Sequence, residues 1–245
     1  MTPGSPDTPA GGMTPMPMLP RGSGSGGPGR QAGAAWCAPR LVARRCARRC
    51  GANAWRAYAA KWRGVPGKRA PPRKPWWDHL WSLVAAFLGI AVLAAMHYNF
   101  PEVSRASLSM LLGSFGASAV LLYATPEAPL AQPGPLVLGH VLSALVGVTV
   151  RIAVVDTCGA AQCEWLGAAA AVAIAIVVMG LTHTMHPPGG ATALLAVIGD
   201  PAIKSLGYLY VIIPTAVGAL ILLFIALAFN NCAPHRRYPQ YWNWW

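Results

Sequence analysis

The stretch HPPGGATA, residues 186–193, decides the fold predicted for this chain. Two consecutive prolines remove two backbone N–H donors, and the residue before a proline is disfavoured in the α conformation. A helix arriving from Trp165 should therefore end near Met185, and a half helix with proline at its start should run over 187–199. The N–H groups of residues 189–192 would then lack partners within that helix, which predicts an anion site beside the glycine backbone.

Long apolar segments around this break predict an all-α membrane protein. Of the 245 residues, 55% are hydrophobic and 11% charged, and the mean hydropathy is +0.43, which is outside the usual range of a soluble domain. Four segments have about the 20 residues that a helix needs to cross a hydrocarbon layer. They cover 80–98, 135–155, 165–185 and 208–229.

Two interrupted apolar stretches, 105–124 and 187–199, complete a predicted helical bundle of six elements. Their interiors, GASAVLL at 116–122 and GATALLA at 190–196, are similar, and a proline turn and a long segment follow each. This order favours an internal repeat. Three elements in each copy would make two inverted repeats with broken or half helices at corresponding places, as in many transporters. Four crossings with two re-entrant loops are the alternative.

Residues 1–75 are predicted to be a disordered basic region. They contain 14 of the 19 Lys and Arg residues, with Asp7 as their only acid. The segment 34–61 interleaves apolar residues with arginine, as an organelle presequence does, although serine is scarce. A permanent tail held by anionic lipid is the alternative. Because the remaining chain is close to neutral, nucleic-acid binding is not predicted.

The membrane domain is expected over 76–233, followed by an aromatic and basic interfacial tail over 234–245. The closing YWNWW at 241–245 suits a membrane interface. Cys158 and Cys163 could form a disulfide if their connection faced an oxidising compartment, but free thiols are the preferred interpretation.

The substrate path is predicted where two half-helix N-termini meet near mid-membrane. Its residues are Ser114, Gly116, Ala117, Ser118, His186, Pro187, Pro188, Gly189, Gly190, Ala191 and Thr192, and a vestibule is predicted from Arg105, His140, Arg151 and His183. A kinked helix packed through its small residues is the alternative for the proline segment. For Arg151 the alternative is a side chain that extends to the membrane surface. Packing is the preferred interpretation of Gly139, Ser143 and Gly147.

Several kinds of function are not predicted. The spans as drawn contain no Asp or Glu, which favours an anionic or neutral solute over a cation. The cysteines and histidines lack the spacing and acidic neighbours of a metal site, so no metal and no cofactor are expected. No hydrolase, zinc-protease or phosphate-binding motif occurs, so the chain is not expected to be an enzyme.

Several motifs resemble the HPP family of integral membrane proteins. They are GSFGASAVLL at 113–122, LAQP at 130–133, GH at 139–140, HPPGGATAL at 186–194, NN at 230–231, RYP at 237–239 and YW at 241–242. The resemblance implies a membrane protein with about four recognisable spans. Plant relatives in the chloroplast envelope are associated with nitrite transport, which implies that location here, with another organelle or the plasma membrane as alternatives.

Together these observations predict a transporter or channel for a small anion, with nitrite as the candidate that the resemblance implies. The expected partners are the lipid bilayer, the anion and, in a homo-oligomer, further copies of the chain. A structural or assembly protein is the first alternative, in which small-residue faces bind other helices. A membrane-embedded enzyme is the second, and it would have to use the histidines.

Overall fold

The structure is a computed structural model that describes residues 54–62, 65, 67–99 and 110–243. The chain divides into two units, 1–70 and 71–245, of which the first is described at 54–62, 65 and 67–70. In the first unit, residues 54–61 form an exposed helix. Most of the predicted presequence, 34–61, lies outside the described residues, so the organelle-targeting role stays a prediction.

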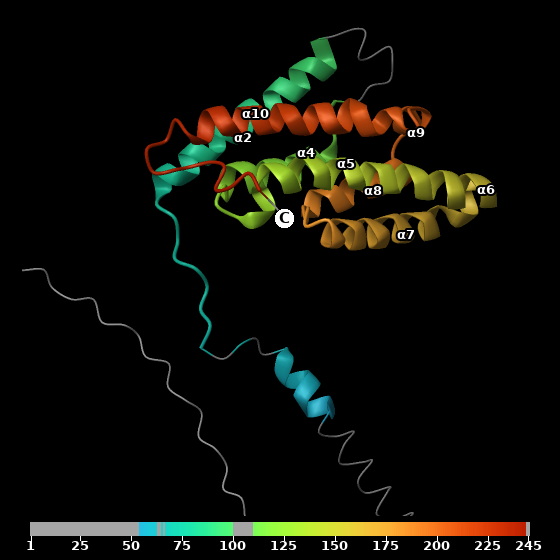
Figure 1. Ribbon diagram of the computed structural model, residues 1–245, viewed down its shortest axis with the longest axis horizontal. Coiled ribbons are helices and arrows are strands. Elements are labelled where there is room, and N and C mark those ends of the chain that lie inside the picture. Colours follow the sequence, from blue (N-terminus) through green and yellow to red (C-terminus); the bar gives the residue numbers. More distant parts are fainter. Residues whose placement is uncertain (1–53, 63–64, 66, 100–109, 244–245) are drawn as a thin grey trace, which may run out of the picture. The chain divides into compact units, whose positions relative to one another are not determined.

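The described part of the second unit is helical, with no strand, and contains four helical segments that are long and apolar enough to cross a membrane (Figure 1). They confirm the four predicted spans. The first is α2 (Trp76–Asn99), and the second is α5 (Pro133–Val150) continued by the π-helical η3 (Arg151–Val155) and α6 (Asp156–Cys158). The third is α7 (Ala160–Leu181), and the fourth is η4 (Val211–Ala216) with α10 (Val217–Asn230).

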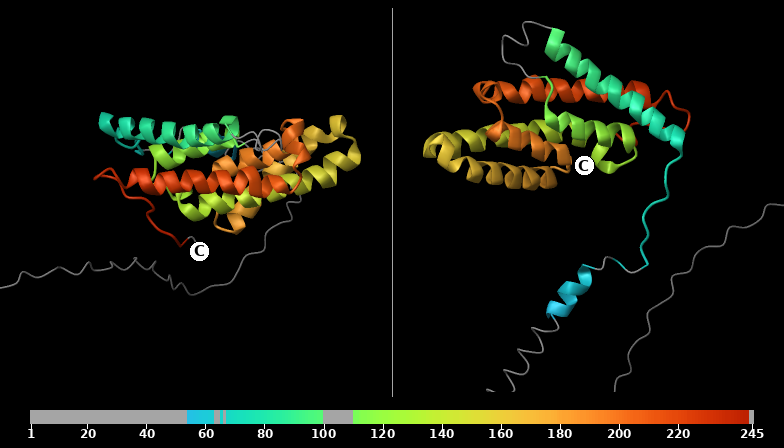
Figure 2. Two further views of the ribbon diagram at one scale, coloured as in Figure 1. Left: turned by 90° about the horizontal axis from the view of Figure 1, so that it is seen from above. Right: turned by 180° about the vertical axis from the view of Figure 1, so that it is seen from behind.

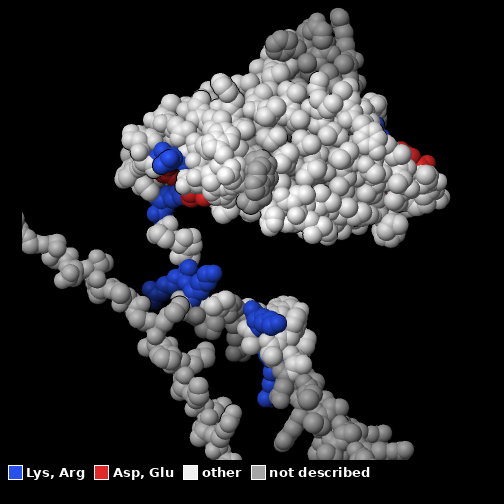
Figure 3. All heavy atoms as spheres, in the orientation of Figure 1, with Lys and Arg blue, Asp and Glu red and all other residues white. Residues whose placement is uncertain are grey.

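The surface of this unit suits a bilayer. Large apolar side chains point outward from three of the long helices, among them Phe87 on α2, Leu181 on α7 and Phe224 on α10. On the face that Figure 3 shows, the charged side chains of the helical unit gather at its two ends, and the surface between them is uncharged. An uncharged band with charged ends is the pattern of an integral membrane protein.

Along the chain, two short helices each lie between two long ones. The first comprises α4 (Gly113–Ala119) and the π-helical η1 (Val120–Ala124), and the second is α8 (Pro187–Ile198). The predicted break at the double proline is confirmed, because His186 is extended (φ −138°, ψ 101°) and α8 begins at Pro187. The first short helix begins at Gly113, whereas the sequence predicted an element from 105; residues 105–109 lie outside the described part.

The helix before the break ends earlier than predicted, at Leu181 and not at Met185. The reason is a Schellman motif: the N–H of Thr184 donates to the carbonyl of Met179 at 2.9 Å, and that of His183 donates to Gly180 at 3.4 Å. His183 has a φ of 55° and fills the left-handed position that glycine usually takes. The chain therefore leaves the helix before the prolines are reached.

The elements follow the order long, short, long twice along the chain, and this order can be followed by colour in Figures 1 and 2. The short helices α4 and α8 pass each other in opposite directions, since Ser114 contacts Thr192 while Ser118 contacts His186. This order is the one that the predicted repeat requires. The inverted relation of the two halves stays a prediction, as does the choice between four and six crossings.

Helix α5 packs closely against α8 and the connection before it. A Cβ atom at Gly139 would lie 2.6 Å from Cβ of His186, and one at Gly147 would lie 2.5 Å from the carbonyl oxygen of Ala193. Both separations are below van der Waals contact. The packing role predicted for these glycines is therefore confirmed, and the absence of side chains here allows the two helices to approach each other.

Two local features differ from the sequence predictions. Cys158 and Cys163 form a disulfide, and the preferred interpretation as free thiols is wrong. Gly159, with a φ of 95°, turns the chain between α6 and α7 so that the two Cα atoms lie 6.1 Å apart, within disulfide range. The fourth span, expected to be continuous, has non-helical backbone at Ile213, before Pro214.

Candidate functional site

Five polar side chains lie buried together where α4, α5 and α8 meet, and we call them the polar cluster. None is more than 1% exposed. Helix α4 contributes two serines, α5 a histidine, and α8 a threonine and the histidine at its N-cap. The members are Ser114, Ser118, His140, His186 and Thr192.

The five side chains form one continuous hydrogen-bond network. Ser118 Oγ lies 2.7 Å from Nε2 of His140 and 3.0 Å from Nε2 of His186. Nδ1 of His140 lies 2.7 Å from Oγ1 of Thr192, which donates to Oγ of Ser114 at 3.0 Å. The two imidazole rings lie 4.9 Å apart between centroids and are tilted by 61°. A single serine hydroxyl thus joins the two histidines.

Surrounding groups hold the two histidines in place. Nδ1 of His186 lies 2.8 Å from the carbonyl oxygen of Leu130, and because a carbonyl only accepts, this nitrogen carries a hydrogen. The ring of Phe115 packs edge-on against His140, with 5.4 Å between ring centroids. Tyr210 donates to the carbonyl of Thr192 at 3.1 Å and ties α8 to the last span.

The N-terminal half of α8 faces the cluster, but it does not present the predicted row of free N–H groups at 189–192. The helix begins at Pro187, so both prolines occupy positions whose N–H groups would have been unpartnered. The N–H of Gly189 donates to the carbonyl of His186 at 2.8 Å. The amides of Ala191 and Thr192 lie deeper in the helix, where α-helical geometry supplies carbonyl partners.

The structure divides the predicted path residues into three groups. Ser114, Ser118, His186 and Thr192 come together in the polar cluster. Pro188 and Gly189 are buried, and a Cβ at Gly189 would lie 2.7 Å from the carbonyl oxygen of Gly139, so this face is packed against α5. The others are half-buried or exposed outside the cluster: Gly116, Ala117, Pro187, Gly190 and Ala191.

The predicted vestibule is not one site. His140 lies inside the polar cluster, because the close approach of α5 to α8 brings it beside Thr192. His183 is exposed in the turn after α7. Arg151 lies at the far end of α5, where it pairs with Asp156 at 3.7 Å and donates to the carbonyl of Lys204. Arg105 is outside the described residues.

Sequence reasoning assigned Ser143 to packing alone, yet its hydroxyl has a further property. Oγ of Ser143 is fully buried and has no hydrogen-bond partner in the part of the chain that the structure describes. A Cβ placed on Gly189 would lie 2.8 Å from this oxygen, so the hydroxyl sits beside the start of α8. A buried unpartnered hydroxyl is costly in a native fold.

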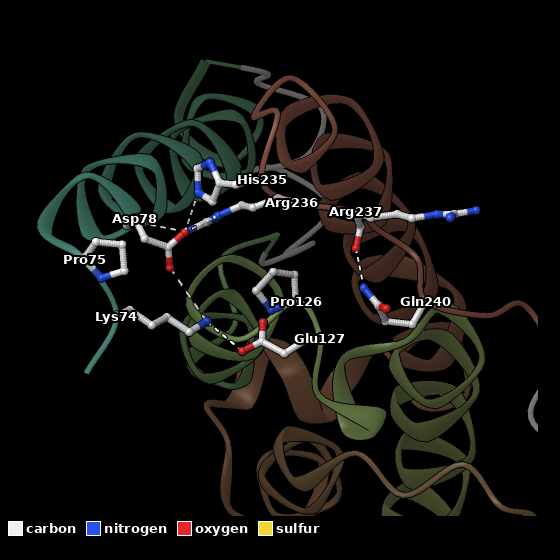
Figure 4. A pocket seen from close by; sticks show the side chains of 9 residues that line it. All are labelled: Lys74, Pro75, Asp78, Pro126, Glu127, His235, Arg236, Arg237 and Gln240. Carbon is white, nitrogen blue, oxygen red and sulfur yellow. Dashed lines mark hydrogen bonds and ion pairs between the residues drawn. The ribbon is translucent and has the colours of Figure 1, made fainter. Parts of the chain in front are cut away.

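A second polar site, missed by sequence reasoning, closes one end of the helical unit (Figure 4). Asp78 is only 5% exposed and accepts from Nε of Arg236 at 2.7 Å, while Nε2 of His235 lies 2.9 Å from the same oxygen. Lys74 pairs with Glu127 at 2.7 Å. These residues line a cavity of about 300 Å³. The predicted span began at residue 80, after this carboxylate, whereas α2 begins at Trp76.

Ion pairs also occupy the opposite end of the unit. Lys204 pairs with Glu164 at 2.5 Å, and Arg151 joins the same region through Asp156 and the carbonyl of Lys204. The charged side chains that form ion pairs in the described helical unit therefore lie at its ends, as Figure 3 shows for one face. None of these ion pairs involves a member of the polar cluster.

Fold and site together define a polytopic helical membrane protein with polar side chains enclosed among its helices. The family model described as "HPP, transmembrane region" matches residues 71–239, and the chain belongs to the HPP family. Two transmembrane proteins of Dictyostelium discoideum are 43% and 45% identical to it over 185 residues. The match covers 76% of this chain but 63% and 57% of those two proteins. No solved structure matches the chain significantly.

Proposed function

We propose that this chain is a transporter for a small anion and that the polar cluster is its substrate site. The observation that carries the proposal is the enclosure of five hydrogen-bonding side chains, from three helices, at 0–1% exposure inside a membrane unit. Polar and ionisable groups are expensive at membrane depth, and where they persist they commonly mark a solute pathway. The five cluster residues fall within the motifs by which this sequence resembles the HPP family: 113–122, 139–140 and 186–194.

The chemistry of the cluster suits an anion. Its members supply hydroxyl and imidazole N–H donors, and the described contacts of the cluster include no carboxylate. The N-terminal half of α8 adds the positive end of a helix dipole. Nitrite is the substrate, and the chloroplast envelope the membrane, that the family resemblance suggests for this chain.

Full burial means that a solute reaches the cluster only when helices move apart. The antiparallel pair α4 and α8 is the element that we propose to move, as one half of the unit rocks against the other. Such motion is the usual consequence of two inverted repeats of three elements around a central site. The structure then corresponds to a state in which the site is closed to both sides.

Uptake into proteoliposomes tests the proposal. The purified protein is assayed with nitrite, nitrate and chloride against protein-free vesicles. Thr192→Val keeps the side-chain shape but removes the hydroxyl from the network, and it should reduce uptake at least tenfold. Thr149→Val is the matched control, because Thr149 is exposed on α5, away from the cluster. Uptake of none of the three anions, or equal uptake by both variants, would contradict the proposal.

The same assay separates the other candidate functions. We propose that the chain is not an enzyme, although Ser118 and His140 are in hydrogen-bond contact, because the described residues place no carboxylate beside that histidine. An enzyme or a structural and assembly protein would show no saturable flux. A homo-oligomer is compatible with transport, and light scattering of the purified protein measures it.

A further inference from the structure

We propose that the polar cluster binds a proton together with the anion, on the pair His140 and His186 bridged by Ser118, so that transport is proton-coupled. This inference rests on the proposed function and names its coupling ion. The proton comes from water on the side where the site is open, forms an N–H bond at Nε2 of one histidine, and returns to water on the other side.

In one tautomer of the cluster, the hydrogen bonds leave a place for one further proton. Nδ1 of His186 donates to Leu130, so its Nε2 is an acceptor when the ring is neutral. The single hydroxyl proton of Thr192 is directed at Ser114 Oγ (3.0 Å) or at the carbonyl of Pro188 (3.3 Å). In the tautomer in which that proton goes to one of these two oxygens, Nδ1 of His140 donates to Thr192 and Nε2 of His140 is also an acceptor.

Both acceptor nitrogens face the same hydroxyl. Nε2 of His140 and of His186 lie 2.7 Å and 3.0 Å from Ser118 Oγ, which carries one hydrogen. The carbonyl of Ser114, at 3.2 Å, competes for it as well. In this tautomer one imidazole nitrogen is left without a donor. Adding one proton there completes the network: the protonated ring donates to Ser118 Oγ, and Ser118 donates to the other ring.

Charge balance is the second reason to expect a proton to bind together with the anion. The described Lys and Arg side chains that form ion pairs lie at the two ends of the unit: Lys74, Arg151, Lys204 and Arg236. An anion brought alone into the cluster would be a buried charge without a counter-ion, which is strongly unfavourable. A histidine that gains a proton becomes a cation with donors directed into the site, and the pair of charges is then neutral.

The surroundings also explain why the two ions would move together. The groups that contact the histidines are Ser118 and Phe115 from α4, Thr192 from α8 and the carbonyl of Leu130. The titratable Tyr210 reaches only the carbonyl of Thr192. The described contacts of the pair thus provide no carboxylate to hold an imidazolium in the empty site. The proton is retained when the anion is present, and the histidines are neutral when it is absent.

Proteoliposomes distinguish coupled from uncoupled transport. Nitrite uptake is followed together with internal pH, using a trapped pH-sensitive dye, and protein-free vesicles give the background from nitrous acid that crosses the lipid. Cotransport of one proton with one anion should acidify the interior and give about tenfold accumulation per unit of pH gradient. A membrane potential set with potassium and valinomycin should leave the rate unchanged, since no net charge moves.

Three outcomes of the uptake experiments decide whether transport is coupled to protons. Electroneutral, proton-driven uptake supports the inference. Uptake that follows the membrane potential without acidification overturns the inference but leaves the proposed function intact. Absence of uptake of any small anion overturns both. These tests use the wild-type protein, so they do not depend on whether a variant folds.

Variants of His140 and His186 test whether these two histidines carry the proton. His140→Gln and His186→Gln keep an amide near the ring nitrogens but cannot carry the proton, and each should reduce proton-driven accumulation at least tenfold. His79→Gln is the control, because His79 is exposed in the first turns of α2. Accumulation by both cluster variants at the level of His79→Gln would overturn the assignment.

Discussion

Gly139→Ala should destabilise the protein by pushing the α7–α8 connection away from α5. The added Cβ would lie 2.6 Å from Cβ of His186 and 2.8 Å from the carbonyl oxygen of Thr184. Neither atom is the end of a flexible side chain, so relief requires a backbone shift of about 1 Å to reach ordinary carbon contact near 3.6 Å. Overpacking of this kind costs about 1–3 kcal/mol.

The shift would also disturb the polar cluster. His186 would move relative to Ser118 and Leu130, with which it is in contact at 3.0 Å and 2.8 Å. Weakening one such buried hydrogen bond lowers the free energy of unfolding by about a further 1 kcal/mol. The total of about 2–4 kcal/mol corresponds to a drop in the melting temperature of roughly 5–10 °C for a domain of this size.

Thermal unfolding in detergent, followed by tryptophan fluorescence, measures the effect. Gly180→Ala is the matched control: it makes the same chemical change near the end of α7, where the new Cβ would meet only Cε of Met185, at 3.7 Å. The control should unfold within a degree or two of the wild type. If Gly139→Ala were as stable as Gly180→Ala, the close packing of α5 against the His186 connection would be refuted.

Three further predictions concern other parts of the helical unit. Asp78→Asn leaves Arg236, whose side chain is 4% exposed, without its counter-charge, and it should lower the free energy of unfolding by about 3 kcal/mol. Glu127→Gln, at an exposed ion pair, should lower it by under about 1 kcal/mol in the same unfolding assay. Equal losses of stability in the two variants would contradict the buried pair. His183→Gly removes a side chain from a left-handed position and should stabilise by about 1 kcal/mol, while a lower melting temperature would exclude the Schellman motif. For Cys158 and Cys163, mass spectrometry should find the peptide two hydrogens heavier after reduction, and alkylation of both thiols without reductant would show that they are not bonded.

The sequence was most informative where local chemistry dictates the backbone. Two prolines at 187 and 188 fix the start of a helix whatever its neighbours do, and a run of about 20 apolar residues fixes a span. Both were therefore predicted correctly. Four of the five cluster members were also among the predicted path residues, because they lie at the two short segments that the sequence marks as half helices.

Features that depend on contacts between distant segments could not be predicted in this way. His140 was assigned to a vestibule, and only the glycine-mediated approach of α5 to α8 brings it to Thr192. Asp78 was not recognised as buried, because its partner Arg236 is 158 residues away along the chain. The early end of α7 depends on a histidine in a conformation that favours glycine, for which the sequence carries no signal.

The central claim is that solute reaches the polar cluster from both sides of the membrane, and cysteine accessibility tests it most directly. Ser114→Cys is made in a protein whose native cysteines are replaced by serine, and membrane-impermeant thiol reagents are added to either side of proteoliposomes of known orientation. Ala144→Cys, equally buried but in the apolar core, is the control. We predict that Ser114→Cys reacts from each side and more slowly with nitrite present, and that Ala144→Cys does not react. If Ser114→Cys failed to react from one side or from both, the claim would be contradicted.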